Sequence, residues 1–278
     1  MKIKGLVSVC IPVYNGEKTI EETIESIINQ TYSNIEIIVV DNCSSDNTVS
    51  IVNSINDSRI KLFTNDENLG MVGNWNKCLE YVSGEFFIIL CADDIIDQNC
   101  IEKKLIPLIK NKNIVLSFGA AKIIDEKNNK LYSRHFFSRN CVFSGTDYAK
   151  KSFRRRNLYG EPSNVLVRSN AIDRVGMFSK DVIYATDWDY WIRISETGLV
   201  SYIDEELYCY RVASNNETSK IGIINILKND KTFVESVRRH TNLDLNILDY
   251  LFHRFNVLIR SMARFCFMKM VSKGLIKG

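Results

Sequence analysis

The chain has 278 residues, of which 45% are hydrophobic and 25% are charged, and its formal net charge is +3. These values exclude a low-complexity or disordered chain, and the length fits one large domain or one domain with an appendage. The eight cysteines are scattered and form no C-x-x-C pair, which argues against a zinc site and indicates buried free thiols in a reducing cytoplasm.

The first part of the chain, residues 6–119, alternates strand and helix patterns. Short apolar runs predict strands at Leu6–Ile11, Ile35–Val40, Ile60–Phe63, Phe86–Leu90 and Ile114–Phe118. The segments between them predict helices at Ile20–Asn29, Thr48–Asn56, Val72–Val82 and Ile101–Lys110. Alternating strands and helices are typical of an α/β protein with a doubly wound, mainly parallel sheet and right-handed crossovers.

After residue 120 the pattern is less regular. Asp125–Lys130 predicts a polar turn between two strands, and residues 131–160 look irregular and basic, with three arginines at Arg154–Arg156. A strand at Asn164–Arg168 precedes a short helix that ends near Gly176. The remaining elements predicted here are a helix at Asp187–Thr197 and strands at Val200–Ile203 and Leu207–Val212.

The last part, about residues 221–275, is predicted to be helical. Apolar residues recur there at three- or four-residue steps, and we expect this stripe to pack on the body of the protein: Leu248, Leu251, Phe255, Leu258 and Met262. Residues 220–278 hold eleven Lys or Arg and four Asp or Glu, so their charge is 11 − 4 = +7, which leaves 3 − 7 = −4 for the rest. Such a basic C-terminus fits either an anionic membrane surface or a solvated helical face.

Two kinds of segment are not predicted. No apolar run approaches the ~18 residues of a membrane-spanning helix. The short apolar stretch after the basic N-terminus runs into Pro12 without a cleavage site, so it does not resemble a signal peptide.

The absence of a basic patch with interleaved aromatic residues argues against nucleic-acid binding.

Two adjacent carboxylates, Asp93 and Asp94, follow the most apolar run of the chain, Phe86–Leu90. The carboxyl end of a central strand is where open α/β sheets bind ligands. Two close like charges repel each other, and a divalent cation relieves the repulsion. Oxygen ligands suit Mg²⁺ or Mn²⁺, whereas the alternative is a solvated turn that caps the next helix.

Polar residues also follow the first and second strands, where Tyr14 and Asp41 lie. The strand ends of a doubly wound sheet converge on one crevice. There an aromatic ring can stack on a base, a carboxylate can accept a hydrogen bond from a base or ribose, and a cation can bridge a diphosphate. Because the chain lacks a glycine-rich phosphate loop, a dinucleotide oxidoreductase and a P-loop ATPase are disfavoured.

With these residues, the chain resembles the family 2 inverting glycosyltransferases, which have a GT-A fold. The resemblance covers roughly residues 6–215. In its first half the matching segments are Val7–Gly16 with Glu17, Asp41–Asp46, Asn68-Leu69-Gly70 with Asn76, and Cys91-Ala92-Asp93-Asp94. In its second half they are Thr186-Asp187-Trp188-Asp189-Tyr190-Trp191-Ile192-Arg193 and Tyr210-Arg211.

The resemblance implies a role for each matching residue. Asp187 would be the general base, Asp94 the ligand of Mn²⁺ or Mg²⁺, and Asp93 a contact to the ribose. Other residues would bind the nucleotide: Pro12, Tyr14, Asn15, Glu17, Asp41, Asn68, Gly70 and Asn76. A weaker set would contact the sugar or acceptor: Trp188, Trp191, Arg193 and Arg211.

Four positions depart from the family pattern. Cys91 stands for the first acid of the D-x-D-D form, and Thr186 stands for the Glu before the catalytic Asp. Trp75 replaces a residue that is often basic, and Ala213 replaces a common His. Other roles for these residues also stay open. Asp187 could cap a helix, Asp189 could equally serve as the base, and Trp191 could belong to the core.

The resemblance implies a metal-dependent inverting transferase for a hexosyl or related group. It would move the sugar from a nucleotide-diphosphate sugar, UDP-sugar above all, to a hydroxyl of a glycan or lipid-linked acceptor in bacterial surface-glycan synthesis. Such an enzyme would be cytoplasmic, with peripheral association at the inner membrane through its basic C-terminus. The alternatives are a catalytically silent nucleotide-sugar-binding or scaffold protein, and a nucleotidyltransferase.

We therefore predict a GT-A domain at residues 1–215, with a nucleotide-binding half at 1–119 and an acceptor-binding half at 120–215. Residues 216–278 would form a helical C-terminal extension. Burial near Trp188 and Trp191 is expected to raise the pKa of Asp187, because an unperturbed aspartate is a weak base.

Overall fold

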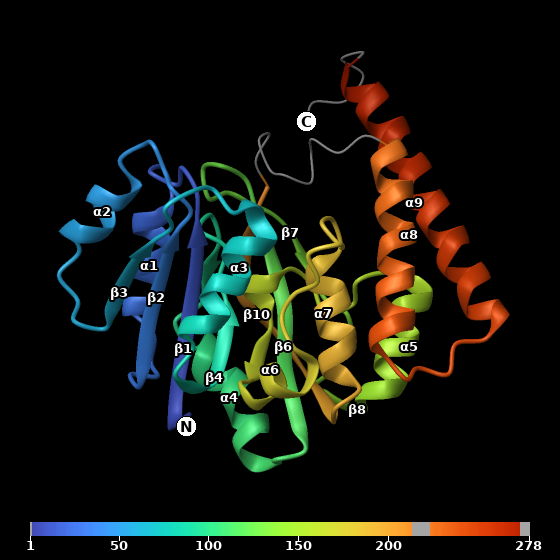
Figure 1. Ribbon diagram of the computed structural model, residues 1–278, viewed down its shortest axis with the longest axis horizontal. Coiled ribbons are helices and arrows are strands. Elements are labelled where there is room, and N and C mark those ends of the chain that lie inside the picture. The colour runs from blue at the N-terminus through green and yellow to red at the C-terminus, as the bar shows by residue number, and fades with distance from the viewer. Residues whose placement is uncertain (1, 213–222, 273–278) are drawn as a thin grey trace.

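The computed structural model describes the backbone of residues 2–212 and 223–272, and the side chains of 2–212 and 228–261 (Figure 1). In the first half the strands are β1 (Ile3–Val13), β2 (Ile35–Asp41), β3 (Ile60–Thr64), β4 (Gly84–Ile89) and β5 (Ile95–Ile96). The helices between them are α1 (Ile20–Ile28), α2 (Thr48–Ser54), α3 (Gly70–Tyr81) and α4 (Cys100–Lys110). Every strand and helix predicted here is confirmed within a few residues, and only the two-residue β5 was not predicted.

The second half holds the strands β6 (Ile114–Ile124), β7 (Lys130–Arg134), β8 (Cys141–Ser144), β9 (Leu166–Arg168) and β10 (Leu199–Arg211). Its helices are α5 (Gly145–Arg155), η1 (Pro162–Asn164, a 3₁₀ turn), α6 (Asn170–Val175) and α7 (Thr186–Ser195). Two long helices follow, α8 (Ile223–His240) and α9 (Ile247–Ser272). The predicted polar turn at Asp125–Lys130 is confirmed, because β6 and β7 pair in antiparallel fashion on either side of it.

Two predictions for this half are wrong. The segment predicted to be irregular contains β7, β8 and α5, whose buried residues Tyr148, Ala149 and Phe153 recur at helical spacing and anchor α5 in the core. The two strands predicted between Val200 and Val212 are one strand, β10. Register shifts against β6 around Ile203 and Glu206 let its acidic middle remain in the sheet.

The strands form one sheet in the order β3-β2-β1-β4-β9-β6-β10-β5, with β7 and β8 added at the sides of β6 and β10. β1 pairs in parallel with β2 and β4, and β10 pairs in parallel with β6. The short β9 is antiparallel to both of its neighbours and joins the two parallel parts. The predicted α/β architecture with a large, mainly parallel central sheet is therefore confirmed.

The core lies on both faces of this sheet. Neighbouring residues of β2 alternate between two hydrophobic clusters, with Ile38 and Val40 in one and Ile37 and Val39 in the other. All seven residues of β2 are buried, as expected for a strand covered by helices on both faces. This rigid sheet fixes the positions of the loops that follow its strands.

The two C-terminal helices pack beside α5 and α7, at one side of the sheet (Figure 1). The prediction that the apolar stripe of this region packs on the body is wrong, because Leu248, Leu251, Phe255 and Leu258 are exposed. α9 instead buries Asp249 and His253, whose polar groups find partners on α5 and α8. The side chain of Met262, the predicted boundary at 215/216 and the basic terminus beyond 272 lie outside the described residues.

Among the residues that the structure describes, no helix is both long enough and apolar enough to cross a membrane.

Candidate active site

The carboxyl ends of β1, β2 and β4 meet at one edge of the sheet. Val13 pairs with Asp41 in the register of β1 and β2, and the amide of Asn42 donates to the carbonyl of Val13 over 2.8 Å. The amide of Leu90, after β4, donates to the carbonyl of Cys10 over 2.8 Å. The residues that follow these strands therefore lie close together at one edge of the sheet, as the sequence predicts.

Asp41 ends β2 with a fully buried carboxylate. Its Oδ2 atom accepts a 3.0 Å hydrogen bond from the amide of Ser44, whereas its buried Oδ1 atom has no hydrogen-bond partner among the described residues. A buried carboxylate oxygen without a partner is costly unless a ligand supplies a donor. The N–H group of a nucleotide base is such a donor.

The residues at the end of β1 and just after it mostly join two loops. Asn15 has a left-handed φ of 52°, and its side-chain Oδ1 atom accepts from the amide of Ser45 over 2.9 Å. Glu17 accepts hydrogen bonds from the backbone and side chain of Asn47. Tyr14 is 52% exposed at the same place, so its ring is accessible to a ligand. Pro12 lies inside β1, in register with Val40 of β2.

The segment before α3 is held by amide side chains. Asn68 Oδ1 accepts from the side chain of Asn42 over 2.7 Å and from the amide of Gly70 over 2.8 Å. Gly70 has a φ of +72°, a conformation that suits glycine. Asn76 exchanges two hydrogen bonds with the backbone of Phe178, so its amide fixes the chain that leads to α7.

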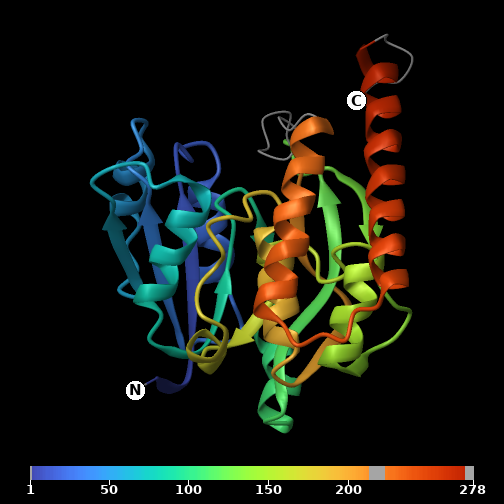
Figure 2. The ribbon, with the colours of Figure 1, turned by 45° about the vertical axis from the view of Figure 1, so that its right-hand side comes forward.

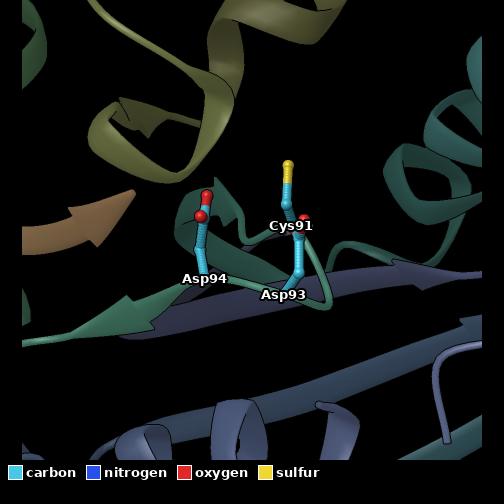
Figure 3. Close-up of side chains that lie close together, drawn as sticks. All are labelled: Cys91, Asp93 and Asp94. Atoms are coloured by element: carbon cyan, nitrogen blue, oxygen red, sulfur yellow. The ribbon is translucent and has the colours of Figure 1, made fainter. Parts of the chain in front are cut away.

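The side chains of Cys91, Asp93 and Asp94 extend from one turn after β4 toward the same side (Figure 3). Their potential ligand atoms lie within 4.8 Å of one another. Burial raises the pKa of Asp93, and burial together with the charge of Asp93 raises the pKa of Asp94 well above its usual range. Burial also raises the pKa of the Cys91 thiol, so Cys91 is a poor ligand for a hard cation.

The carboxylate pair fits a divalent cation on chemical grounds. Two acids in a partly buried turn repel each other, and a cation between them would remove that repulsion. Asp94 is held for this role by the hydroxyl of Ser163, which donates to Oδ2 over 2.5 Å, and by the amide of Arg211, which donates to Oδ1 over 3.1 Å. Each carboxylate oxygen keeps a further lone pair for a metal.

Arg211, at the end of β10, is attached to the same turn. Its Nε atom donates to the carbonyl of Asp93 over 2.8 Å, and its guanidinium forms a 2.6 Å ion pair with Glu22. Arg211 therefore links β10 to Glu22 of α1.

A hollow of about 310 Å³ contains Asp187, near the start of α7. Its walls come from α7, α8, α9 and the segment before η1, and include Trp188, Phe233 and Arg260. The side-chain amide of Asn157 donates to Oδ2 of Asp187 over 2.9 Å. Burial, reinforced by the negative charge of Glu161, raises the pKa of Asp187 to about 7. This confirms the expected direction and gives the carboxylate the basicity that a general base needs near neutral pH.

The segment Glu161–Ser163 connects the two acidic sites, and the sequence analysis missed it. Glu161 lines the Asp187 hollow and is paired with Arg134 and Tyr208, which keep its pKa low despite burial. Two residues later, Ser163 contacts Asp94. The sequence signal was a glycine, Glu and Pro directly before an apolar strand, a turn signal in a segment that otherwise shows no periodicity.

The structure distinguishes the positions of residues on α7 whose roles the sequence left open. Trp188 lines the hollow and donates from Nε1 to Ser152 Oγ over 2.8 Å, whereas Trp191 is fully buried in the core beside Phe178. Asp189 is buried in a 2.9 Å ion pair with Arg193. Asp187 thus lines the hollow, while Asp189, Trp191 and Arg193 lie outside it.

Two of the residues that depart from the family pattern have contacts that explain their side chains. Trp75 is buried and packs edge-on against Phe178 at 5.2 Å between ring centroids. Thr186 is buried, and its hydroxyl donates to the carbonyl of Ser179 over 3.5 Å. Ala213 lies outside the described residues.

The sequence matches known proteins along most of its length. The model of Glycosyl transferase family 2 matches residues 8–181. An uncharacterized glycosyltransferase of Haemophilus influenzae is 34% identical over 230 residues, covering 77% of this chain and 68% of the relative. The UDP-Glc:alpha-D-GlcNAc-diphosphoundecaprenol beta-1,3-glucosyltransferase WfgD of Escherichia coli is 32% identical over 218 residues, covering 77% of this chain and 80% of the relative.

Solved structures agree on the fold. S. aureus TarS 1-349 in complex with UDP-GlcNAc has a TM-score of 0.71 at 19% identity, covering 98% of this chain and 73% of that chain. The mannosyltransferase PcManGT from Pyrobaculum calidifontis in complex with GDP-Man and Mn²⁺ has a TM-score of 0.59 at 17% identity, covering 98% of this chain and 81% of that chain. Since the family model covers more than half of the chain and the relatives agree with it, the chain belongs to glycosyl transferase family 2 and is a glycosyltransferase.

Proposed function

We propose that this glycosyltransferase moves a sugar from a UDP-sugar to a hydroxyl of a lipid-linked glycan, with inversion of the anomeric centre and with the help of a divalent cation. The observation that carries the proposal is the half-buried Asp187, with a pKa of about 7, in a hollow that Glu161–Ser163 connects to the Asp93–Asp94 turn. An acceptor base and a diphosphate site are the two parts that a single displacement requires.

The donor would lie over the ends of β1, β2 and β4. Asp41 Oδ1 would accept a hydrogen bond from the base, and the exposed ring of Tyr14 would stack on the base. The E. coli relative uses UDP-Glc by its name, and TarS binds UDP-GlcNAc in its solved structure, which favours UDP as the nucleotide.

Asp94, with Asp93 beside it, would hold Mn²⁺ or Mg²⁺. A cation bound there neutralises charge on the diphosphate and so makes it a better leaving group. PcManGT was solved with Mn²⁺, which supports the same use here. Ser163 and the amide of Arg211 orient the Asp94 carboxylate for this contact.

The acceptor hydroxyl would enter the hollow beside Trp188 and transfer its proton to the Asp187 carboxylate as its oxygen attacks the anomeric carbon. The bond from that carbon to the diphosphate breaks on the opposite face, so the configuration inverts. Asn157 holds Oδ2 of Asp187 in place, and Trp188, stacked on Phe233 (4.5 Å between ring centroids), forms an aromatic wall of the hollow.

A donor screen tests the proposal. UDP release from a panel of sugar nucleotides is measured with Mn²⁺, with Mg²⁺ and with EDTA, for the wild type and for Asp94→Ala. We expect slow release from one UDP-sugar that EDTA and the substitution both abolish. Metal-independent turnover contradicts the role of Asp94. UDP binding without turnover of any donor, even with a diphosphate-linked glycan acceptor, supports the silent nucleotide-sugar-binding alternative instead.

A further inference from the structure

The outer face of α9 is apolar. Six large side chains expose between 48% and 60% of their surface there: Leu248, Leu251, Phe252, Phe255, Leu258 and Ile259. In the stretch 247–261 the one charged side chain classed as exposed is Arg254. Single exposed apolar residues are ordinary on a protein surface, but a continuous face of six along about three helical turns marks an interaction site. Figures 1 and 2 show α9 at the outer edge of the molecule.

The inner face of α9 is polar, and its contacts fix the orientation of the helix. Asp249 is fully buried and pairs with Arg154 of α5 and with Lys150 over 3.4 Å. His253 contacts the carbonyl of Phe153 over 2.8 Å and Asp230 over 2.7 Å. Rotating the helix to bury its apolar face would break these buried polar contacts and leave Asp249 and His253 without their partners. The apolar face is therefore left for a partner.

A basic hollow of about 970 Å³ lies beside the apolar face, between α5 and α9. Phe252 belongs to both, and the hollow is also lined by Lys151, Arg155 and Arg156, with Asp147 as its one acidic residue. Asp249 offsets the charges of Lys150 and Arg154. Arg155 and Arg156 are exposed and form no ion pair with the described part of the chain, so their charge is available to a partner.

From this arrangement we infer that the apolar face of α9 and the adjoining bases of α5 dock on an anionic phospholipid membrane. A helix with one apolar face beside a basic surface lies in the bilayer interface, with its apolar side chains among the acyl chains and its bases at the phosphates. A second copy of the chain is a poorer partner, because a two-fold contact through α9 brings two basic hollows together.

Docking in this orientation affects which acceptors can reach the active site, and this consequence rests on the proposed function. The opposite face of α9 supplies Val257, Arg260 and Ser261 to the hollow that contains Asp187. One helix diameter, about 10 Å, thus separates the membrane surface from the hollow. A glycan anchored in the same membrane through a lipid can then reach the Asp187 carboxylate, whereas a free sugar gains nothing from docking.

Sedimentation of the full chain with vesicles tests the inference without any donor or acceptor. Vesicles of phosphatidylglycerol with phosphatidylcholine are compared with vesicles of phosphatidylcholine alone. We expect binding to the anionic vesicles only, weakened by salt. The double variant Arg155→Gln/Arg156→Gln should bind roughly twenty-five-fold more weakly, since each base near an anionic surface contributes about a factor of five. Leu251→Gln/Phe255→Gln should weaken binding at least about tenfold.

Matched controls separate docking from general surface properties. Ile109→Gln removes an exposed apolar residue from α4, and Lys110→Gln/Lys112→Gln removes two positive charges at its end. Both should bind vesicles like the wild type, and every variant should retain UDP affinity if it folds. Wild-type protein that ignores anionic vesicles overturns the inference, as do Leu251 and Arg155 variants that bind like the controls. A dimer in light scattering that Leu251→Gln/Phe255→Gln dissociates, without vesicle binding, assigns the face to a second copy.

These outcomes are distinguishable from a failure of the proposed function. If vesicle binding responds to the variants but no sugar is transferred from any donor, the proposed transfer is wrong and membrane docking is supported. If sugar is transferred to a lipid-linked acceptor without vesicle binding, the proposed function is supported and membrane docking is wrong.

Discussion

The side-chain amide of Asn157 donates a 2.9 Å hydrogen bond to Oδ2 of Asp187 and holds the carboxylate at the wall of its hollow. Burial and the nearby charge of Glu161 favour the neutral form of Asp187, whereas this contact favours the charged form. Burial is the larger effect, so the pKa rises to about 7. The surroundings of Asp187 therefore set both the position and the basicity of the proposed base.

The rate of transfer should depend on pH through Asp187. The base must be ionised to accept a proton, so kcat/KM should fall as the pH decreases through about 7 and level off above it. A pH profile of transfer, measured with saturating metal, checks this expectation. An acidic limb near pH 4, about the value of an ordinary aspartate, would show that the carboxylate is not perturbed in the working enzyme.

Asn157→Ala should move that acidic limb to higher pH. Removing a hydrogen bond to a charged group costs about 1.5 kcal/mol, which corresponds to about one pH unit. The rate on the plateau should change less than the rate on the acidic limb. A control substitution at Asn53, an exposed amide on α2, should leave the profile where it is. A profile that falls uniformly at all pH values would indicate lost structure rather than a shifted pKa.

Asp187→Asn should stabilise the protein at alkaline pH. The folded pKa of Asp187 lies above the unfolded value of about 3.9, so the folded state binds the proton more tightly, and wild-type stability falls as the pH rises from about 4 to about 7. The substitution removes this penalty, which amounts to at most about 4 kcal/mol. Urea unfolding in mildly acidic and in mildly alkaline buffer checks the difference. The neighbouring Asp189→Asn makes the contrast, because it breaks the buried pair with Arg193 and should destabilise the protein.

Asp41→Ala should weaken UDP binding by one to two orders of magnitude. The buried Oδ1 atom lacks a partner in the described structure, and a lost hydrogen bond to a charged acceptor costs about 1.5–3 kcal/mol. Calorimetric titration with UDP measures the change, and Asp66→Ala at an exposed position after β3 serves as the control. Equal affinities for the two variants would remove Asp41 from the nucleotide site.

Much of the donor side was predictable from the sequence. Asp41, Asp93 and Asp94 lie at or just after the ends of strands in one parallel part of the sheet, and the geometry of such a sheet brings strand ends together whatever the loops do. The resemblance pointed to Asp187, but the chemistry of the residues alone could not choose between it and Asp189. That choice depends on Arg193, which takes Asp189 into a buried pair.

The parts that sequence analysis missed depend on contacts between distant segments. Glu161 and Ser163 lie in a turn without periodicity, and their role follows from partners on β10 and after β4. The orientation of α9 was predicted wrongly for a similar reason. An apolar stripe normally turns inward, but Asp249 and His253 have buried partners on α5 and α8 that turn this helix the other way.

We propose that Asp187 accepts the proton of the acceptor hydroxyl, and a comparison of Asp187→Asn with the wild type checks this role. Sugar transfer and UDP affinity are measured for the wild type and for Asp187→Asn, and the neighbouring Asp189 is left unchanged because its ion pair with Arg193 supports the fold. We expect kcat to fall by about 10²–10⁴-fold while UDP affinity is unchanged. Near-normal transfer by Asp187→Asn would show that another group is the base.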